Sequence, residues 1–424
     1  MRRGSSCLAL TLALAAPAAA HTGVLGARAP FLEGGLLVGG STTWGLVLAD
    51  DGTFFRVCDE APAMAANFHL RVGARVLVGG SPGLLATDDR GCSYQPRGLA
   101  GATDATAAVA AGGRVYVATG RAGYPNAVFA SDDGGLTFQA TALSGTASPL
   151  WELVAAPDGS VLVVSGDDLD LEQPLLLGSV DQGAHWSTGT LELSSYVRVR
   201  ALSVSAAGDE VLVAAERGDE SAWLVSLDAT LSPLETVAAP RALTHAVRKG
   251  EALFAVADTE ELLAWPAGGG AFAASGVQVK CLFLVDDTLW ACGSTTGPLA
   301  GVHFATSSDG QTWTSVLHDV DIRERTCPDG TAGHDACVRY QDAGPAVDAG
   351  DDAGAADAGS SDAGAADAGV VDAGAGDDDA GPQERPRPAP SCAGCASSEG
   401  GPGLCWALVA LSARWACSPR SRRR

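Results

Sequence analysis

The sequence predicts an all-β protein made of seven similar units, each contributing four short strands. Two observations support this fold class. One short box recurs with close matches at TDDRGCSY (87–94), SDDGGLTF (131–138) and SVDQGAHW (179–186), and with a looser match at TSSDGQTW (306–313). Short β-rich runs separated by Gly or Asp turns precede the boxes, and no sustained helical periodicity interrupts them.

The boxes are spaced like the repeats of a single array. Eroded copies fill the gaps between the clear ones, namely LADDGTFF (48–55), SLDATLSP (226–233) and WPAGGGAF (265–272). The seven copies end at a mean spacing of 43 residues. Four short strands in about 40–45 residues are typical of a propeller blade. We therefore expect a single seven-bladed β-propeller of four-stranded blades over residues 21–322, with each box between the third and fourth strands.

The residue types of the box favour a tight turn. Its acidic side chain can accept backbone N–H bonds, its glycine provides a positive φ, and its aromatic residue packs the fourth strand onto the sheet. In the copy at 306 the acid comes one place late. We expect a structural role for the following box residues: Thr87, Asp89, Gly91, Tyr94, Ser131, Asp133, Gly135, Phe138, Ser179, Asp181, Gly183, Trp186, Asp309, Gly310 and Trp313.

The pattern S-x-D-x-G-x-x-W/F resembles the Asp-box, or BNR, repeat. This repeat is found in bacterial sialidases, xyloglucanase-type glycosidases, sortilin-type receptors and photosystem II assembly factors. The resemblance implies a structural hairpin remote from any active site, so the boxes predict a scaffold and leave the ligand open.

The first twenty residues have the three parts of a secretory signal peptide. A basic start precedes an apolar run from Cys7 to Ala16, and three alanines end the segment at Ala20. The apolar run is too short to span a bilayer as a stable helix. We therefore expect export, with residues 1–20 removed.

The chain beyond the propeller changes composition twice. Residues 323–340 are a Cys-containing capping loop, and residues 341–391 form an Asp-Ala-Gly and Pro-rich linker whose first part, 341–382, holds eleven Asp and no Lys or Arg. A segment with so little apolar bulk and so much self-repulsion is expected to be a disordered stalk. The formal net charge of −23 also argues against nucleic acid as a partner.

The last residues, 392–424, contain a Cys pair, a short apolar run and a terminal Arg cluster. They resemble the myxobacterial C-terminal sorting signal. The resemblance implies a short hydrophobic anchor, a sorting protease of the envelope that cuts near Cys392 and Cys395, and display at the cell surface or outer envelope, with release into the medium as an alternative. Membrane contact is expected only through this tail. A redox or zinc pair at Cys392 and Cys395 is the other interpretation, weakened because no second matching pair exists.

Two local disulfides are expected in an exported chain. Cys281 and Cys292 lie symmetrically about the Asp286-Asp287 turn, so a hairpin would set them opposite each other. Cys327 and Cys337 lie ten residues apart in a Gly/Asp-rich loop. A bond between Cys58 and Cys92, near the ends of adjacent blades, is a further alternative.

Ligands of propellers usually bind at the channel mouth, on the face opposite the boxes. The loops between second and third strands and the starts of the inner strands form this mouth. The polar, aromatic and basic side chains expected there suit sugars or peptides. The candidate binding residues are Arg28, Arg121, Tyr124, Trp151, Glu152, Asp168, Arg200 and Trp223.

An acidic cluster in the fourth unit, Asp167, Asp168, Asp170 and Glu172, lacks the glycine and the ligand spacing of a dedicated calcium loop. No metal, cofactor or catalytic residue is therefore predicted. The preferred function is non-catalytic binding of a glycan or surface protein at the mouth. A secreted sialidase-like or other glycoside hydrolase is the alternative, and a purely structural surface protein is third.

Overall fold

A computed structural model describes the chain from Pro30 to His334, apart from residues 34, 43–44, 58–61, 63, 100–103 and 169–172. The chain divides into two compact units, Met1–Asp351 and Asp352–Arg424, and every described residue belongs to the first. The predicted signal peptide, stalk and sorting tail lie outside the described residues.

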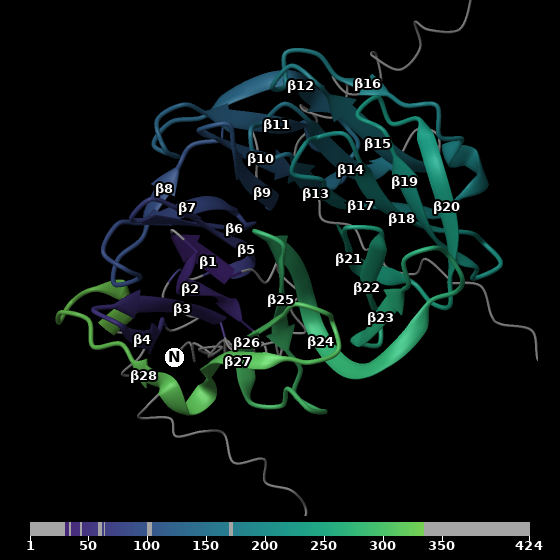
Figure 1. The fold of residues 1–424 in the computed structure, drawn as a ribbon. Coiled ribbons are helices and arrows are strands. Elements are labelled where there is room, and N and C mark those ends of the chain that lie inside the picture. Colours follow the sequence, from purple (N-terminus) through teal and green to yellow (C-terminus); the bar gives the residue numbers. More distant parts are fainter. Residues whose placement is uncertain are drawn as a thin grey trace, which may run out of the picture. The chain divides into compact units, whose positions relative to one another are not determined.

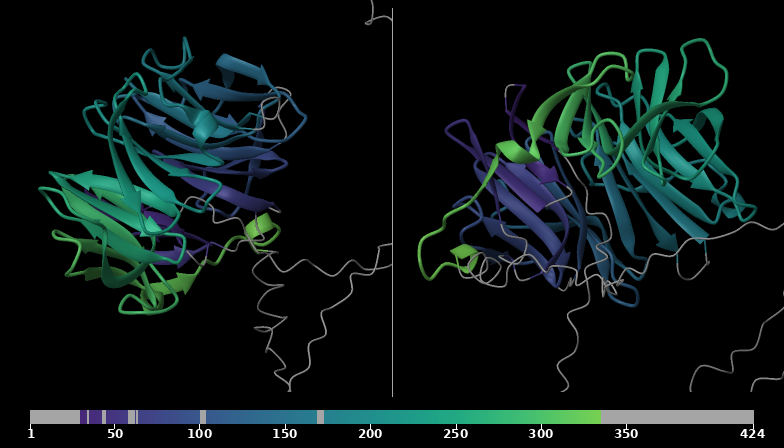
Figure 2. Two further views of the ribbon diagram at one scale, coloured as in Figure 1. Left: turned by 90° about the vertical axis from the view of Figure 1, so that its right-hand side faces the viewer. Right: turned by 90° about the horizontal axis from the view of Figure 1, so that it is seen from below.

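The described residues form a seven-bladed β-propeller whose blades follow one another round a ring in sequence order (Figure 1). Figure 2 shows the same ring from two further sides. The blades are antiparallel sheets in chain order. The strands of blades 1 to 3 are β1 (Pro30–Glu33), β2 (Leu36–Thr42), β3 (Gly45–Asp50), β4 (Thr53–Arg56); β5 (Ala65–Val72), β6 (Arg75–Ser81), β7 (Gly83–Thr87), β8 (Gln95–Arg97); and β9 (Ala105–Ala111), β10 (Arg114–Thr119), β11 (Asn126–Ser131), β12 (Gln139–Thr146).

The first strands of blades 2 to 7 lie innermost, since the first strands of neighbouring blades in this series contact one another, as β5 contacts β9. Two short 3-10 helices, η1 (Leu193–Ser195) and η2 (Asp319–Asp321), join strands. The strands of blades 4 to 7 are β13 (Leu150–Ala155), β14 (Leu162–Asp168), β15 (Gln173–Ser179), β16 (Ser187–Thr188); β17 (Arg198–Val204), β18 (Val211–Glu216), β19 (Ala222–Leu227), β20 (Pro233–Ala239); β21 (Leu243–Lys249), β22 (Ala252–Ala257), β23 (Glu261–Trp265), β24 (Ala273–Val285); and β25 (Thr288–Gly293), β26 (Val302–Ser307), β27 (Thr314–His318).

Strand β24 belongs to two blades. Its first part pairs with β23 as the outer strand of blade 6, and its part from Val279 to Val285 pairs with β25 as the inner strand of blade 7. Gly276, with a φ of +76°, lies at an irregularity within the first part, between Ala274 and Gln278, which both pair with β23. The sequence predicts two separate strands here, whereas the structure has one.

Each blade buries apolar side chains on both of its faces. In β10, Val115 and Val117 pack into the core between blades 2 and 3, while Tyr116 and Ala118 pack into the core between blades 3 and 4. This alternation is the period of two of a strand covered on both sides. Seven such cores lie between the seven blades, including one that joins blade 7 to blade 1, so the ring is closed.

Four turns between third and fourth strands share one hydrogen-bond network, and we call them the box turns. After β11, Ser131 Oγ accepts the N–H of Gly135 at 2.8 Å and donates to Asp133 Oδ1 at 2.7 Å. Asp133 Oδ1 also accepts the N–H of Thr137 at 2.9 Å. The hydroxyl groups that take this place in the four box turns are buried and belong to Thr87, Ser131, Ser179 and Ser307.

The carboxylates of the box turns are held in the ionised form. Hydrogen bonds from the side chain and backbone of Thr137 and from Ser131 keep the pKa of Asp133 well below its usual range. A hydrogen bond from the His185 ring is the largest cause that lowers the pKa of Asp181 to about 2. The aspartates therefore stabilise the turns as anions.

The last box turn is one residue shorter than the other three. Alignment on Trp313 places Thr306 at the hydroxyl position and Asp309 one place late. In the structure the hydroxyl belongs to Ser307, which accepts the N–H of Gly310 at 2.8 Å and donates to Asp309 at 3.0 Å. The missing residue therefore lies between the acid and the glycine. The turn is one residue shorter but keeps the same hydrogen bonds.

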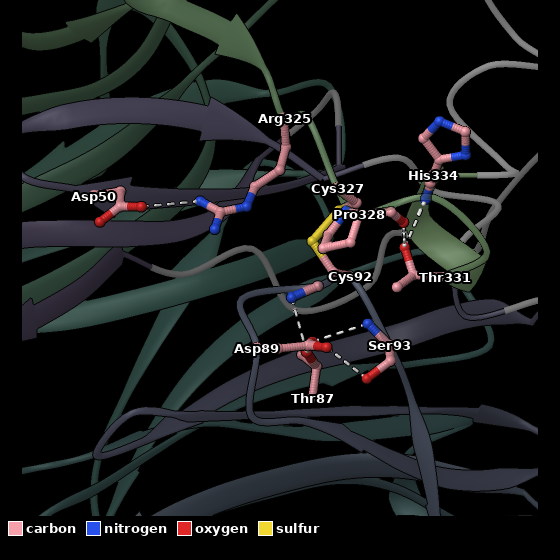
Figure 3. The surroundings of a disulfide bond; sticks show 11 residues. Asp50, Thr87, Asp89, Cys92, Ser93, Arg325, Cys327, Pro328, Thr331 and His334 are labelled. Atoms are coloured by element: carbon pink, nitrogen blue, oxygen red, sulfur yellow. Dashed lines mark hydrogen bonds and ion pairs between the residues drawn. A yellow bond between two sulfur atoms is a disulfide. The ribbon is translucent and has the colours of Figure 1, made fainter.

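The end of the propeller returns to blade 1. Strand β28 (Ile322–Glu324) adds a fifth, parallel strand to the outer edge of β4, so strand structure continues past the expected boundary at residue 322. Beyond it, Cys327 forms a disulfide with Cys92 of blade 2, at a sequence separation of 235 (Figure 3). We call residues 319–334 the clasp.

The disulfide predicted between Cys327 and Cys337 is therefore wrong, as is the alternative that joins Cys92 to Cys58. Closure of the ring brings Cys327 to a Cα–Cα distance of 5.4 Å from Cys92, which no local spacing reveals. Cys337 and Cys58 lie outside the described residues. The second disulfide joins Cys281 to Cys292 across the β24–β25 hairpin, the pair expected from the sequence.

Candidate functional site

The mouth of the channel is shaped by a β-bulge near the start of the inner strands. An extra residue there has no partner in the second strand, which turns its side chain out of the regular pleat. In blade 4, for example, Leu150 pairs with Gly166 and Glu152 with Ser165, so Trp151 is the extra residue. The equivalent bulge residues of five blades are Asn67, Thr106, Trp151, Thr244 and Lys280.

Glycines at the ends of the second strands make room for these bulges. A Cβ added to Gly80 would lie 2.0 Å from the carbonyl oxygen of Ala65, and one added to Gly166 would lie 2.2 Å from that of Pro149. Glycine is required there because the inner strand approaches too closely for any side chain. This explains why the β-rich runs of the sequence end in Gly.

Some bulge residues tie neighbouring blades together. Asn67 Nδ2 donates to the carbonyl of Ala105 at 3.0 Å, which links blade 2 to blade 3. Thr106 Oγ1 donates to the carbonyl of Leu150 at 2.6 Å, which links blade 3 to blade 4. These side chains are therefore committed to the ring and are not available to a ligand.

Glu152 and Arg200, both predicted to bind a ligand, also join two blades. Arg200 Nε lies 2.8 Å from Glu152 Oε1, and Ser165 Oγ donates to Glu152 Oε2 at 2.7 Å. Ser165 Oγ in turn accepts the N–H of Ala201 at 3.0 Å. The pair thus connects blade 4 to blade 5 as a structural bridge.

Similar bridges occur at the next two blade boundaries. Arg248 Nε lies 2.8 Å from Glu210 between blades 5 and 6, and Lys280 Nζ lies 3.5 Å from Glu260 between blades 6 and 7. The repetition indicates that such ion pairs belong to the architecture of the ring.

Tyr124 and Arg121 remain exposed in the loop between β10 and β11. The Arg121 guanidinium lies 4.1 Å from the centre of the Tyr124 ring, which is 42 % exposed. The loop is fixed by Asn126, whose side chain accepts the N–H of Arg121 and donates to the carbonyls of Arg121 and Tyr124. The ring and the cation are thus presented to solvent on a defined backbone.

Trp151 presents a second aromatic surface on the neighbouring blade. Its indole is 42 % exposed, and its Nε1 donates to Asp167 Oδ2 at 2.8 Å. The bulge directs the side chain outward, and the hydrogen bond fixes the orientation of the ring. The sequence offers Trp151 as a candidate, but nothing in it shows that Asp167, sixteen residues away, holds the ring in place.

Trp223 forms a third aromatic group on blade 5. The Arg217 guanidinium lies 5.1 Å from the Trp223 ring and 5.5 Å from the Tyr196 ring, and Trp223 Nε1 donates to Ser221 Oγ at 3.3 Å. Arg217 and Tyr196 are absent from the residues predicted to bind. Their position in the second-to-third-strand loop and just before the inner strand is the signal that identifies them.

Two predicted site residues cannot be placed. Arg28 and the side chain of Asp168 lie outside the described part of the structure, as does most of the acidic cluster of blade 4. Among the described residues, no group of three or more His, Cys, Asp or Glu side chains is arranged to hold a metal ion. Within the same ranges, no helix has the length and apolar character needed to cross a bilayer.

Two hollows of the surface lie away from the mouth. One of about 430 Å³ lies beside the clasp and includes Phe54, Val320 and Arg323 in its lining. The other, of about 120 Å³, lies between the third-to-fourth-strand turns of blades 4 and 5 and includes Trp186 and Leu231. Tyr124, Trp151 and Trp223 are not among the residues that line these two hollows.

No protein-family model matches the chain, and no curated protein matches it. Solved structures with a similar fold include the extracellular domain of the putative one-component system BT4673 from B. thetaiotaomicron, with 13 % identity, a TM-score of 0.47, and coverage of 64 % of this chain and 37 % of that one. Another is YCF48 bound to D1 peptide, with 17 % identity, a TM-score of 0.40, and coverage of 58 % and 79 %. A third is the β-propeller domain of the Trilobed protease from Pyrococcus furiosus, with 13 % identity, a TM-score of 0.37, and coverage of 52 % and 73 %. The likeness to each is one of fold.

Proposed function

We propose that this protein is an exported propeller that binds a glycan, without catalysis, at the mouth of blades 3 to 5, and that its box turns are Asp-box repeats. The observation that carries the proposal is the pair of solvent-exposed aromatic side chains Tyr124 and Trp151 on blades 3 and 4, followed on blade 5 by Trp223, which is partly buried against the core between blades 4 and 5. Aromatic rings offer flat apolar faces that can stack on pyranose rings. Each lies next to a polar side chain that can bond sugar hydroxyls, namely Arg121, Asp167 and Arg217.

A secreted glycoside hydrolase is the second candidate, because a carboxylate, Glu152, directly follows the exposed Trp151 in the inner strand β13. Glycosidases generally place two carboxyl groups on either side of the scissile bond. Glu152 is instead engaged by Arg200 and Ser165 in the bridge between blades 4 and 5. We therefore favour binding over hydrolysis. The release of reducing ends from a bound glycan would reverse that preference.

The experiment is a glycan array probed with the purified full-length protein, followed by calorimetry on the glycans that bind. We expect selective binding that weakens about tenfold or more in Tyr124→Ala and Trp151→Ala, since buried aromatic contacts dominate the energetics of such sites. Leu234→Ala is the matched control, because Leu234 is 60 % exposed but lies on the outer strand β20. If the folded protein binds no glycan on the array, the glycan proposal is refuted, and a protein ligand or a scaffold role becomes the better explanation.

We further propose that the chain is displayed at the cell surface through its C-terminal tail after cleavage by a sorting protease. Export is supported by the disulfides Cys92–Cys327 and Cys281–Cys292, since disulfides persist in oxidising compartments. Cell fractionation of the full chain and of a chain ending at residue 391 tests the proposal. The full chain should remain with the envelope and the shortened chain should enter the medium, and equal release of both would refute the anchor.

A further inference from the structure

The clasp holds the two ends of the ring together through a small number of contacts. Strand β28 pairs with β4 through three residues only. Arg56 lies 3.2 Å from Asp319 and 3.7 Å from Glu324, and Arg325 Nη1 lies 3.4 Å from Asp50. Figure 3 shows the Arg325–Asp50 contact near the disulfide. Partly exposed ion pairs and a three-residue strand contribute little on their own.

The blade that the clasp covers also has the smallest described cores. Six buried side chains form the core between blades 1 and 2, and six form the core between blades 7 and 1, whereas twelve form the core between blades 4 and 5. Blade 1 therefore has less apolar packing to hold it in the ring once the clasp is released.

The disulfide between Cys92 and Cys327 is the one covalent link between the clasp and the ring among the described residues. Cys92 lies inside the box turn of blade 2, and the N–H of Gly333 donates to its carbonyl at 2.9 Å. A bond that closes so long a loop removes more entropy from the unfolded chain than a short one. The disulfide also restrains the clasp near β4, and so raises the effective concentration at which its strand pairing and ion pairs form.

We propose that the Cys92–Cys327 disulfide is a redox-controlled closure of the ring. When it is oxidised, the clasp stays on blades 1 and 2. When it is reduced, the clasp leaves β4 and blade 1 loosens, while blades 3 to 6 remain folded on their own cores. The chain would thus stay open in a reducing compartment and close after export.

The chemistry of closure is thiol–disulfide exchange with a small-molecule disulfide such as oxidised glutathione. One cysteine thiolate attacks a sulfur of the oxidant and expels one glutathione thiolate, forming a mixed disulfide. The second thiolate attacks the protein sulfur of that mixed disulfide and expels the second glutathione. Two protein thiols thereby lose two protons and two electrons, and the oxidant is reduced to two thiols.

Hydrogen–deuterium exchange of the full-length protein tests this closure. In Cys92→Ala/Cys327→Ala, exchange in β4 and β28 should accelerate about tenfold or more, while exchange in β10 and β18 should match the unaltered protein. The matched control is Cys281→Ala/Cys292→Ala, which removes a disulfide of separation 11 within one hairpin. Its β28 should remain protected.

Wild-type protein exchanged in dithiothreitol and in oxidised glutathione provides a second measurement that needs no variant. Fast exchange of β4 and β28 in the reductant alone, reversed by oxidised glutathione, would support the proposal. Unchanged protection of β28 after verified reduction would overturn it, as would loss of protection throughout the ring, because closure would then be either independent of the bond or inseparable from global folding.

Discussion

The boundary between blades 4 and 5 and the boundaries of blade 1 hold neighbouring blades together in different ways. The first buries twelve apolar side chains from five strands and the turns beside them, and adds the Glu152–Arg200 bridge. Each boundary of blade 1 buries six apolar side chains. Blade 1 is also supported by the clasp, which adds the fifth strand and several ion pairs and is joined to blade 2 by a disulfide. The boundary between blades 4 and 5 thus rests on a larger apolar core, whereas strand pairing, ion pairs and a disulfide reinforce blade 1, where the two ends of the ring meet.

The largest effect is expected from emptying the stronger core. Leu227→Ala removes a side chain with no exposure from the boundary between blades 4 and 5, and should lower the free energy of unfolding by about 2–5 kcal/mol. Leu46 is 2 % exposed, and Leu46→Ala should leave a similar cavity in the core between blades 1 and 2. Urea unfolding should show a global loss for Leu227→Ala, whereas hydrogen exchange should show local opening of blade 1 for Leu46→Ala. Equal local opening in both variants would contradict the comparison.

Acid should weaken the boundary between blades 1 and 2, where His69 of β5 contacts blade 1. Burial lowers the pKa of His69 to about 4, and its Nδ1 lies 3.0 Å from Ser41 Oγ of blade 1. Since the folded-state pKa lies below the ordinary value of 6.5, the unfolded chain binds the proton first, so stability is complete above about pH 6.5 and falls toward pH 4. The loss should be about 3 kcal/mol.

Stability measured at pH 7 and pH 4.5 in wild type and His69→Gln checks this expectation. His69→Gln should be less stable at pH 7 but should lose less on acidification. Burial is also the main cause that lowers the pKa of His303, which lies 3.3 Å from Asp319 of the clasp, so some pH dependence should remain in the variant. An unchanged slope would exclude His69 as its source.

A smaller effect is expected in a box turn far from blade 1. Ser131→Ala leaves the N–H of Gly135 buried without its acceptor, and should cost about 1–3 kcal/mol. Ser131→Thr is the matched control, because Thr87 makes the same bonds in blade 2. Chemical denaturation of both variants measures their free energies of unfolding. A Ser131→Ala protein as stable as wild type would show that the hydrogen-bond network of this box turn is dispensable.

The smallest effect is expected from the ion pairs of the clasp. Arg325→Gln removes the contact with Asp50, which Arg90 also contacts, so the carboxylate keeps a partner. The melting temperature should fall by less than about 3 °C. A larger fall would mean that Arg325 contributes through its packing over Phe55, at 5.5 Å, more than through its charge.

The sequence predicts the blades well because each repeat carries its own local signal. Turn residues, alternating apolar positions and the closing glycine of the second strand all lie within one unit, so Ser131 and Gly135 can be assigned without knowledge of the rest. Contacts between units have no such signal. Cys92 and Cys327 become neighbours only when the ring closes, and Glu152 meets Arg200 only when two blades pack.

The candidate site can be divided in the same way, into residues that the sequence identifies and partners that only the folded structure brings to them. Tyr124, Trp151 and Trp223 could be selected because a loop or strand start places them at the mouth. Their partners depend on how one strand lies against another, as Asp167 on β14 does for Trp151 on β13. The bulge that turns Trp151 outward is a feature of strand register, which the identities of the residues alone do not specify.

The continuity of β24 has a mechanical consequence. Strand β24 runs without a break from blade 6 into blade 7 (Figure 1), so no loop between these blades can act as a hinge, and the two blades should move together. Any transient separation of neighbouring blades must then occur at the other blade boundaries. An enlarged opening of the channel would therefore begin on the side of blade 1 and would leave the arc from blade 6 to blade 7 rigid.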